Sequence, residues 1–394
     1  MKKILKRIAV GLPLTFVVLL TTALGYSHVT ISRPVEVPLP RIKADMSPEA
    51  RAKGAAIFHS MCEDCHLDRH TGRAAGAQMK EVPSFLGEFY SANLTRDKKA
   101  GIGGLSDGQV ARQVRFAVNR HNQMTIMPSF GMSDADLAAV IGYLRSDDPL
   151  FAPDPKVNPK SRLSAQGKLI ALSAGAIRVP NRPADGIVAP PKGPTVEWGH
   201  YLAESVYDCG GCHTAGFDPE KTSKPGAFAG GGEFVDPAGQ KVLTANLTFD
   251  ATGIAAYTPE EFETAVREGV RRDGTTLRVM PRFRGLDETD TRALYAFLKT
   301  KPKVQNAIAR TAAPPAKKGD DPAKLFVSLG CTSCHAAGAQ YHAKLANAKG
   351  KNVDDVARWI RHPEQFKPGT PMPTYASLLA EEDAVRLAQW VQKR

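Results

Sequence analysis

The hydrophobic pattern divides the chain into one uncharged run near the N-terminus and, after it, short helical segments with polar ends. The run extends from Ile8 to Gly25, 18 residues without a charge. It follows four cations, Lys2, Lys3, Lys6 and Arg7. As a helix the run would be about 27 Å long, close to the ~30 Å hydrocarbon core of a bilayer. Residues 1–26 are therefore predicted to form a transmembrane helix or a signal peptide.

The pattern favours a retained anchor over a cleaved signal. The apolar run is longer than the core of a usual signal peptide, although Ala23 to Gly25 forms a small-x-small cleavage site. In both cases the positive flank stays in the cytoplasm, so the chain after Tyr26 is exported. We expect the protein on the periplasmic side of the bacterial inner membrane, anchored by its N-terminal helix.

Three later stretches repeat one order of helical signals. Each begins with a capping residue before a short helix. The three caps are Ser47, Thr195 and Asp321. Each stretch ends with an amphipathic helix that carries an aromatic residue. These helices are predicted at Ser133–Arg145, Asp287–Lys299 and Ala380–Gln392.

These signals predict an all-α fold of three small domains in tandem after the N-terminal helix. The domains are predicted at residues 46–150, 195–300 and 321–394. Residues 151–194 contain proline throughout and form a first linker. Residues 301–320 form a second, which ends in TAAPPAKKGDD and is expected to be solvated and flexible.

An internal repeat relates the first two domains. The tetrapeptide ANLT occurs at Ala92–Thr95 and at Ala245–Thr248, and a Met-Pro pair follows each copy. Met127 and Met280 both stand 35 residues after the alanine of their copy. Equal spacing between equal motifs indicates one domain that has been duplicated.

The composition is typical of globular domains but does not identify a binding partner. The chain has 394 residues, of which 42% are hydrophobic and 23% charged, as in water-facing globular domains. The net charge of +12 could favour an anionic partner. The basic residues are spread along the chain, and no stretch resembles a nucleic-acid-binding module, so no nucleic acid is expected.

All six cysteines occur in three copies of one motif. The copies are CEDCH at Cys62–His66, CGGCH at Cys209–His213 and CTSCH at Cys331–His335. Six cysteines in an exported protein ordinarily suggest three disulfides, and Cys-x-x-Cys also occurs in redox disulfides and zinc sites. Neither explains the histidine after each second cysteine. Cys-x-x-Cys-His is the attachment motif of c-type haem, so three covalently bound haems are predicted, with Cys62, Cys65, Cys209, Cys212, Cys331 and Cys334 holding the vinyl groups.

The iron ligands follow from the same motifs and from the methionines. His66, His213 and His335 are predicted as proximal ligands. Met280 is the only methionine between the second and third motifs, and Met372 is the only one after the third motif. Both precede proline. Met127 also precedes proline, with Met124 and Met132 nearby. Proline stiffens the loop that carries the sulfur, and we predict Met127, Met280 and Met372 as distal ligands.

The first two domains resemble the repeated domains of the trihaem cytochrome c subunits of bacterial membrane-bound alcohol and sugar-acid dehydrogenases. The haem motifs, the ANLT segments, the Met-Pro pairs, AFAGG (Ala227–Gly231) and REGVRRDG (Arg267–Gly274) carry this resemblance. It implies class I cytochrome c domains that take electrons from a flavin- or quinone-containing partner. In such domains an aromatic residue of the last helix packs against a small residue of the first, for which Gly54 and Gly199 are suitable. The third domain, with its shorter interval from His335 to Met372, looks more like the cytochrome c domain fused to some haem–copper oxidase subunits.

The expected function is electron transfer without a substrate of its own. A membrane dehydrogenase or quinol-oxidising complex would be the donor, and cytochrome oxidase or another cytochrome the acceptor. Iron with both axial positions filled by protein groups has no open site for oxygen or peroxide. The alternative is a multihaem peroxidase-like enzyme with one open haem, for which His121, and less well His342 and His362, are candidates.

Overall fold

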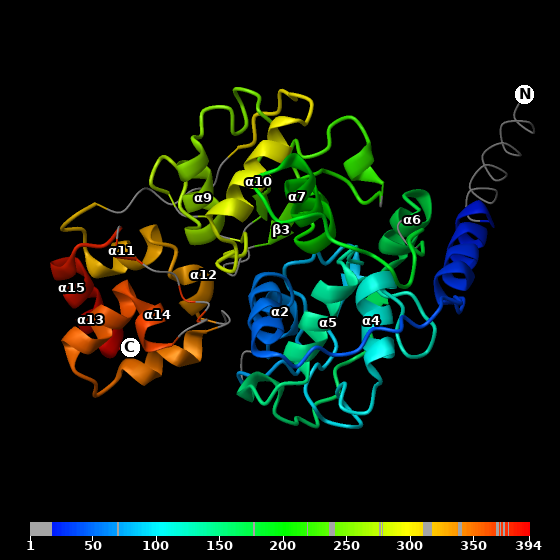
Figure 1. The fold of residues 1–394 in the computed structure, drawn as a ribbon, viewed down its shortest axis with the longest axis horizontal. Coiled ribbons are helices and arrows are strands. Elements are labelled where there is room, and N and C mark those ends of the chain that lie inside the picture. Colours follow the sequence, from blue (N-terminus) through cyan, green and yellow to red (C-terminus); the bar gives the residue numbers. More distant parts are fainter. Residues whose placement is uncertain are drawn as a thin grey trace, which may run out of the picture.

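The computed structural model describes most of the chain after residue 17. The residues it describes are 18–394 except 69–70, 176–177, 219, 236–240, 276, 278, 310–316, 338–340, 368–369, 371, 373–374 and 377. They form a helix at 18–32 and three groups of helices, which Figure 1 shows arranged around a common centre. In this described part the strands form two short antiparallel pairs, so the regular structure is mostly helical.

The predicted N-terminal span is only partly described. Residues 1–17 lie outside the described part, and the helix at 18–32 runs beyond Gly25. Its Val18, Leu19, Tyr26 and Val29 side chains are each more than half exposed. Of the helices in the described residues, none is both long enough and apolar enough to cross a membrane.

The first group of helices is built around a crossing of its first and last members. It contains α2 (Pro48–Met61), α3 (Glu63–His66), α4 (Asp107–Phe116), α5 (Asp134–Leu144) and the 3₁₀ turn η1 (Pro149–Phe151). A Cβ on Gly54 of α2 would lie 2.1 Å from the carbonyl oxygen of Ala139 and 3.0 Å from the Cβ of Tyr143 on α5. Glycine thus permits the close crossing, and the predicted packing of Tyr143 against Gly54 is confirmed.

The first linker folds back on this group. Strand β1 (Gly87–Glu88) pairs with β2 (Arg162–Leu163) in antiparallel register, with Gly87 opposite Leu163. Helix α6 (Ala165–Ser173) follows, and a Cβ on its Gly167 would lie 2.0 Å from the carbonyl oxygen of Leu86. A proline-rich segment is therefore held in place by a strand pair and a close helix contact.

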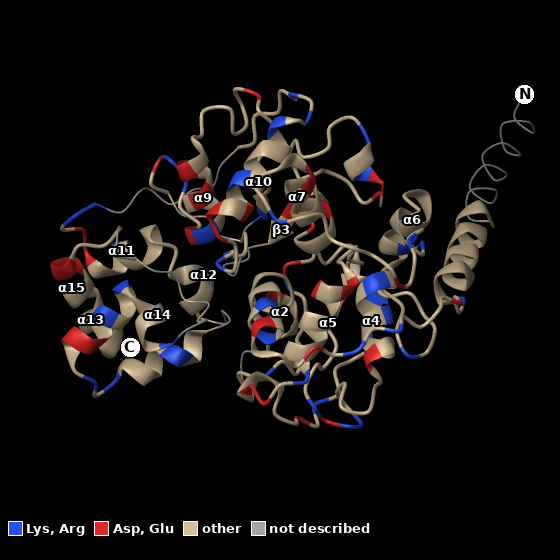
Figure 2. Ribbon diagram, in the orientation of Figure 1, with Lys and Arg blue, Asp and Glu red and all other residues tan. Residues whose placement is uncertain are grey.

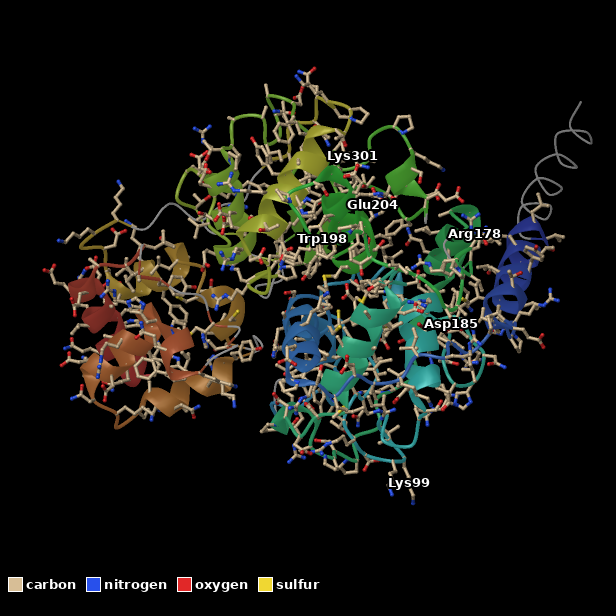
Figure 3. The ribbon with its side chains drawn as sticks, viewed as in Figure 1. Lys99, Arg178, Asp185, Trp198, Glu204 and Lys301 are labelled. Atoms are coloured by element: carbon tan, nitrogen blue, oxygen red, sulfur yellow. The ribbon has the colours of Figure 1, made fainter. Side chains whose placement is uncertain are left out.

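The second group repeats the plan of the first. It contains α7 (Val196–His200), the π-turn η2 (Tyr201–Val206), α8 (Cys209–Cys212), η3 (Lys221–Ser223), α9 (Pro259–Glu268) and α10 (Glu288–Lys299), with the strand pair β3 (Glu233–Val235) and β4 (Lys241–Leu243). Gly199 takes the place of Gly54, since its Cβ would lie 2.0 Å from the carbonyl oxygen of Ala293. Trp198, labelled in Figure 3, donates from Nε1 to Asp290 at 2.8 Å and fixes α7 to α10.

The third group has a hydrophobic core of its own. It contains α11 (Pro322–Ser328), α12 (Thr332–His335), η4 (His342–Ala348), α13 (Val353–Arg361), α14 (Pro363–Phe366) and α15 (Glu381–Gln392). The first two groups instead share one continuous core. Tyr201 joins them, because its hydroxyl donates to Asp136 at 2.5 Å and accepts from the Ser133 amide at 2.8 Å. Lysine, arginine and acidic residues occur on all three groups in Figure 2.

Two expectations about local structure need amendment. The two strand pairs mean that the fold is mostly rather than wholly helical. The second linker is packed in its first part, because the carbonyl oxygens of Val304 and Asn306 accept from the Asn246 side chain at 2.8 and 3.4 Å. Residues 310–316, which include its alanine-proline segment, lie outside the described residues.

Candidate haem sites

One large cavity lies between the three groups of helices. Its volume is about 3640 Å³, several times that of a typical small-molecule pocket of about 300–1,000 Å³. Ten of the twelve predicted haem-site residues line it. They are Cys65, Met127, Cys209, Cys212, His213, Met280, Cys331, Cys334, His335 and Met372. The other two, Cys62 and His66, adjoin the lining residues Met61 and Leu67.

The six cysteines are free thiols in this structure. Burial raises the pKa of Cys62, Cys209 and Cys331 to about 12. Burial also raises the pKa of Cys212 to about 11. In a Cys-x-x-Cys redox pair the thiol pKa is instead lowered. Within the described residues, no cluster of three or more His, Cys, Asp or Glu side chains could hold a metal ion.

Each motif histidine is oriented by a backbone carbonyl. Nδ1 of His66 lies 2.8 Å from the carbonyl oxygen of Ala92, and Nδ1 of His213 lies 2.8 Å from that of Ala245. Nδ1 of His335 lies 2.9 Å from the carbonyl oxygen of Tyr341. Because a carbonyl can only accept, Nδ1 carries the proton and Nε2 keeps its lone pair. This is the tautomer that an iron-binding imidazole needs.

Burial keeps these imidazoles neutral. Removal from water lowers the pKa of His66, His213 and His335, and in each case the carbonyl partner acts in the opposite direction. A neutral histidine with a lone pair on Nε2 can donate an electron pair to a metal. His213 and His335 line the cavity, and His66 adjoins its lining residue Leu67. The arrangement therefore fits a haem iron at each of the three motifs.

The ANLT repeat holds the carbonyl acceptors in place. The alanine of each copy supplies the oxygen, and the asparagine folds the turn that follows it. Asn246 accepts from the Thr248 amide at 2.9 Å and from its hydroxyl at 2.8 Å. Asn93 makes the same two contacts to Thr95, at 2.9 and 2.6 Å. The repeat thus orients the histidines of the first two motifs, a role that its sequence alone does not reveal.

The residue before each ANLT adds a second contact to the haem motif. The Ser91 hydroxyl donates to the carbonyl oxygen of Cys65 at 2.5 Å, and the Thr244 hydroxyl donates to that of Cys212 at 2.9 Å. A serine or threonine immediately before ANLT in both copies was the sequence signal for this contact. The third group has no ANLT copy and uses the Tyr341 carbonyl instead.

The methionines divide into cavity and core residues. Met127, Met280 and Met372 all line the cavity, together with Pro128 and Pro281. Met132 is only 1% exposed and lies in the hydrophobic core, so it is a packing residue. Met124 lines the cavity as well. The Gln113 amide lies 3.6 Å from the sulfur of Met127, a weak contact that holds this thioether.

The histidines considered for an open haem site lie elsewhere. His121 is exposed in the loop after α4, and His342 is exposed with Nδ1 2.9 Å from the carbonyl oxygen of His335. His362 is half-buried where α13 meets α14. None of these three described residues lines the cavity.

Comparison with known proteins identifies the first group. Residues 51–147 match the family model of cytochrome c, so the chain contains a cytochrome c domain there. Domains of this class bind haem c covalently through the Cys-x-x-Cys-His motif, which this segment contains at Cys62–His66.

Several relatives are named as cytochromes or as cytochrome subunits of dehydrogenases. The fructose dehydrogenase cytochrome subunit of Gluconobacter japonicus is 34% identical over 149 residues, which are 37% of this chain and 29% of the relative. The cytochrome c subunit of the quinone-type alcohol dehydrogenase of Gluconacetobacter polyoxogenes is 40% identical over 106 residues, 26% of this chain and 21% of the relative. The chain therefore spans less than a third of these two relatives. A diheme cytochrome c-type protein of Cereibacter sphaeroides is 25% identical over 298 residues, 71% of this chain and 95% of the relative.

Proposed function

We propose that this protein is a trihaem c-type cytochrome that transfers electrons between a membrane dehydrogenase or quinol-oxidising complex and a respiratory acceptor. The observation that carries the proposal is the threefold recurrence of one arrangement. In each group of helices a Cys-x-x-Cys-His motif carries a neutral histidine that is held through Nδ1 by a carbonyl, and residues of all three motifs line one shared cavity.

The proposal assigns each residue type one task. The cysteine pairs hold the haem edges, His66, His213 and His335 bind iron through Nε2, and Met127, Met280 and Met372 bind it from the other side. A haem c supplies one-electron chemistry at its iron. Because the protein fills both axial positions, no site is left for a substrate to bind the metal. The shared cavity favours exchange of electrons between the groups over separate reactions in each.

The names of the relatives support a dehydrogenase as electron donor. Two are cytochrome subunits of fructose and alcohol dehydrogenases, and sequence similarity to them lies mainly in one part of the chain. A terminal oxidase or another cytochrome is the proposed acceptor. We place the protein on the periplasmic side of the inner membrane, with the N-terminal segment as its anchor. The exposed apolar side chains of the helix at 18–32 support that placement.

Haem stoichiometry tests the proposal. The full-length protein, expressed with the cytochrome c maturation machinery, should show by intact mass three covalently bound haems per chain. Cys209→Ser/Cys212→Ser should lower the number to two, and the equivalent double substitutions in the other motifs should do the same. A wild-type protein with two haems or fewer would contradict the proposal. The matched control is Ser328→Ala, which leaves every motif intact.

A further inference from the structure

Two side chains join the third group of helices to the other two, close to the predicted haem-site residues. Tyr341 belongs to the third group and contacts the predicted ligand His335. Arg284 belongs to the second group and contacts the backbone of the predicted ligand Met372. Tyr341 links the proximal side of the third motif to the first motif. Arg284 links the loop that carries Met280 to the loop that carries Met372.

Tyr341 makes contacts in two directions. Its backbone oxygen accepts from Nδ1 of His335, and its backbone amide donates to the carbonyl oxygen of Cys334 at 2.7 Å. Its hydroxyl donates to Oε1 of Glu63 at 2.5 Å, and Glu63 lies between the two cysteines of the first motif. One residue therefore touches the predicted proximal ligand of the third haem and the attachment site of the first.

Contacts within the first group already hold the Glu63 carboxylate in position. The residue is only 3% exposed, and its other carboxylate oxygen lies 2.7 Å from Nδ1 of His59. Nε2 of His59 lies 3.0 Å from the Tyr143 hydroxyl, which donates to Asp148 at 3.0 Å. A buried carboxylate held by partners on both sides has a fixed position, so the bond to Tyr341 fixes the third group against the first.

Arg284 makes the second connection. Its Nη1 donates to the carbonyl oxygen of Thr370 at 3.1 Å and to that of Met372. Arg282, two residues earlier, donates to the carbonyl oxygens of Leu277 and Met280 at 3.0 and 3.2 Å. The segment after Met280 thus contacts two methionine loops. Arg282 holds the loop that carries Met280, and Arg284 holds the loop that carries Met372.

From these contacts we infer that Tyr341 and Arg284 are positioning residues that make the third haem the junction of the electron path. The inference rests on the proposed function and specifies its route. In each exchange one electron leaves a ferrous haem and reduces a ferric haem, and no covalent bond changes. The third group is held to both of the others at or beside residues of the haem sites, so a haem bound there would be placed to exchange electrons with each.

The experiment removes the two connections in the full-length holoprotein. Tyr341→Phe loses only the hydroxyl and keeps the carbonyl that orients His335. Arg284→Gln loses the guanidinium. The matched controls are Tyr295→Phe, which removes a phenol-to-carbonyl bond of 2.8 Å to Tyr257 within the second group, and Arg292→Gln, which removes exposed ion pairs on α10.

Hydrogen exchange of backbone amides should report how firmly the third group is held against the other two. In each single variant, peptides that cover residues 331–348 should exchange roughly tenfold faster than in wild type, as expected for loss of the hydrogen bonding to a charged group. The double variant should exchange faster still, and its third haem should accept electrons from the photoreduced first and second haems at least about tenfold more slowly. Arg284→Lys should restore part of both properties, and the controls should match wild type.

The outcomes separate this inference from the proposed function. Three haems with wild-type exchange and wild-type electron transfer in the double variant would overturn the inference and leave the proposed function standing. A wild-type protein with fewer than three haems would overturn both. Retention of the weak sulfur-to-iron absorption band in the variants would show that slower transfer comes from the position of the third group and not from loss of a ligand.

Discussion

At the scale of single residues, a hydrogen bond from Nδ1 to a backbone carbonyl orients each motif histidine. It selects the tautomer and fixes the plane of the imidazole, so Nε2 would meet a haem iron in one orientation. In the first two groups the carbonyl belongs to the alanine of ANLT, and its position depends on the asparagine that follows. Asn246 is only 3% exposed, and its side-chain amide donates to Val304, a residue beyond α10.

Replacement of either ANLT asparagine should therefore affect one haem and spare the others. We expect Asn246→Ala to destabilise the protein by about 1–3 kcal/mol, because buried partners lose their hydrogen bonds. The reduction potential of the second haem should rise, since a weaker Nδ1–carbonyl bond makes His213 a poorer donor to ferric iron. Asn93→Ala is the matched control and should move the first haem instead. Chemical denaturation and a spectroscopic redox titration measure both effects, and equal shifts at all three haems would refute the assignment.

The distal ligand can be tested at a single methionine. Met280→His should keep the second haem attached, because Cys209 and Cys212 remain, and should lower its reduction potential. Imidazole stabilises ferric iron better than a thioether does. Met132→Leu is a suitable control because Met132 is buried in the core. A redox titration of the Met280→His protein that overlays wild type would show that Met280 does not bind iron.

At the scale of helices, the crossing of the first and last helix determines the shape of each cytochrome-like group. Gly199→Ala should be destabilising by about 1–3 kcal/mol, because the new methyl group would meet the Ala293 carbonyl on α10. Gly193→Ala is the matched control, since its nearest neighbour would be the Thr195 methyl at an ordinary 3.5 Å. Thermal unfolding of the two variants measures the difference. Equal midpoints for both would mean that the crossing relaxes without cost.

The helices were predictable because their signals are local. Ser47, Thr195 and Asp321 cap the helices that the sequence assigned to them. The strand pair β1–β2 was not predicted, because two residues on each side give no periodicity and their partners lie far apart in sequence. The carbonyl of Tyr341 was missed for a related reason. A backbone oxygen has no side-chain signature, and only the ANLT repeat marked the equivalent oxygens in the other groups.

At the scale of the whole molecule, the three groups differ in how they are joined. The first two share a hydrophobic core, whereas the third has a separate core and meets the others through polar contacts such as those of Arg284 and Tyr341. A separate core allows the third group to be removed while the shared core of the first two stays intact. The second linker, of which residues 310–316 lie outside the described part, marks the place to cut.

Removal of residues 321–394 should interrupt the electron path at its exit. The truncated protein should retain two haems, because the motifs at Cys62–His66 and Cys209–His213 and their ANLT acceptors are untouched. Both haems should remain reducible by the donor, since the resemblance of the first two domains to dehydrogenase subunits points to them as the entry. Electrons should no longer reach the terminal acceptor, because the third domain, which looks more like an oxidase-linked cytochrome domain, would be absent.

Oxygen consumption by membranes that contain donor substrate measures this loss, with His335→Ala in the full chain as a matched variant. Normal respiration by the truncated protein would show that electrons leave from one of the first two haems.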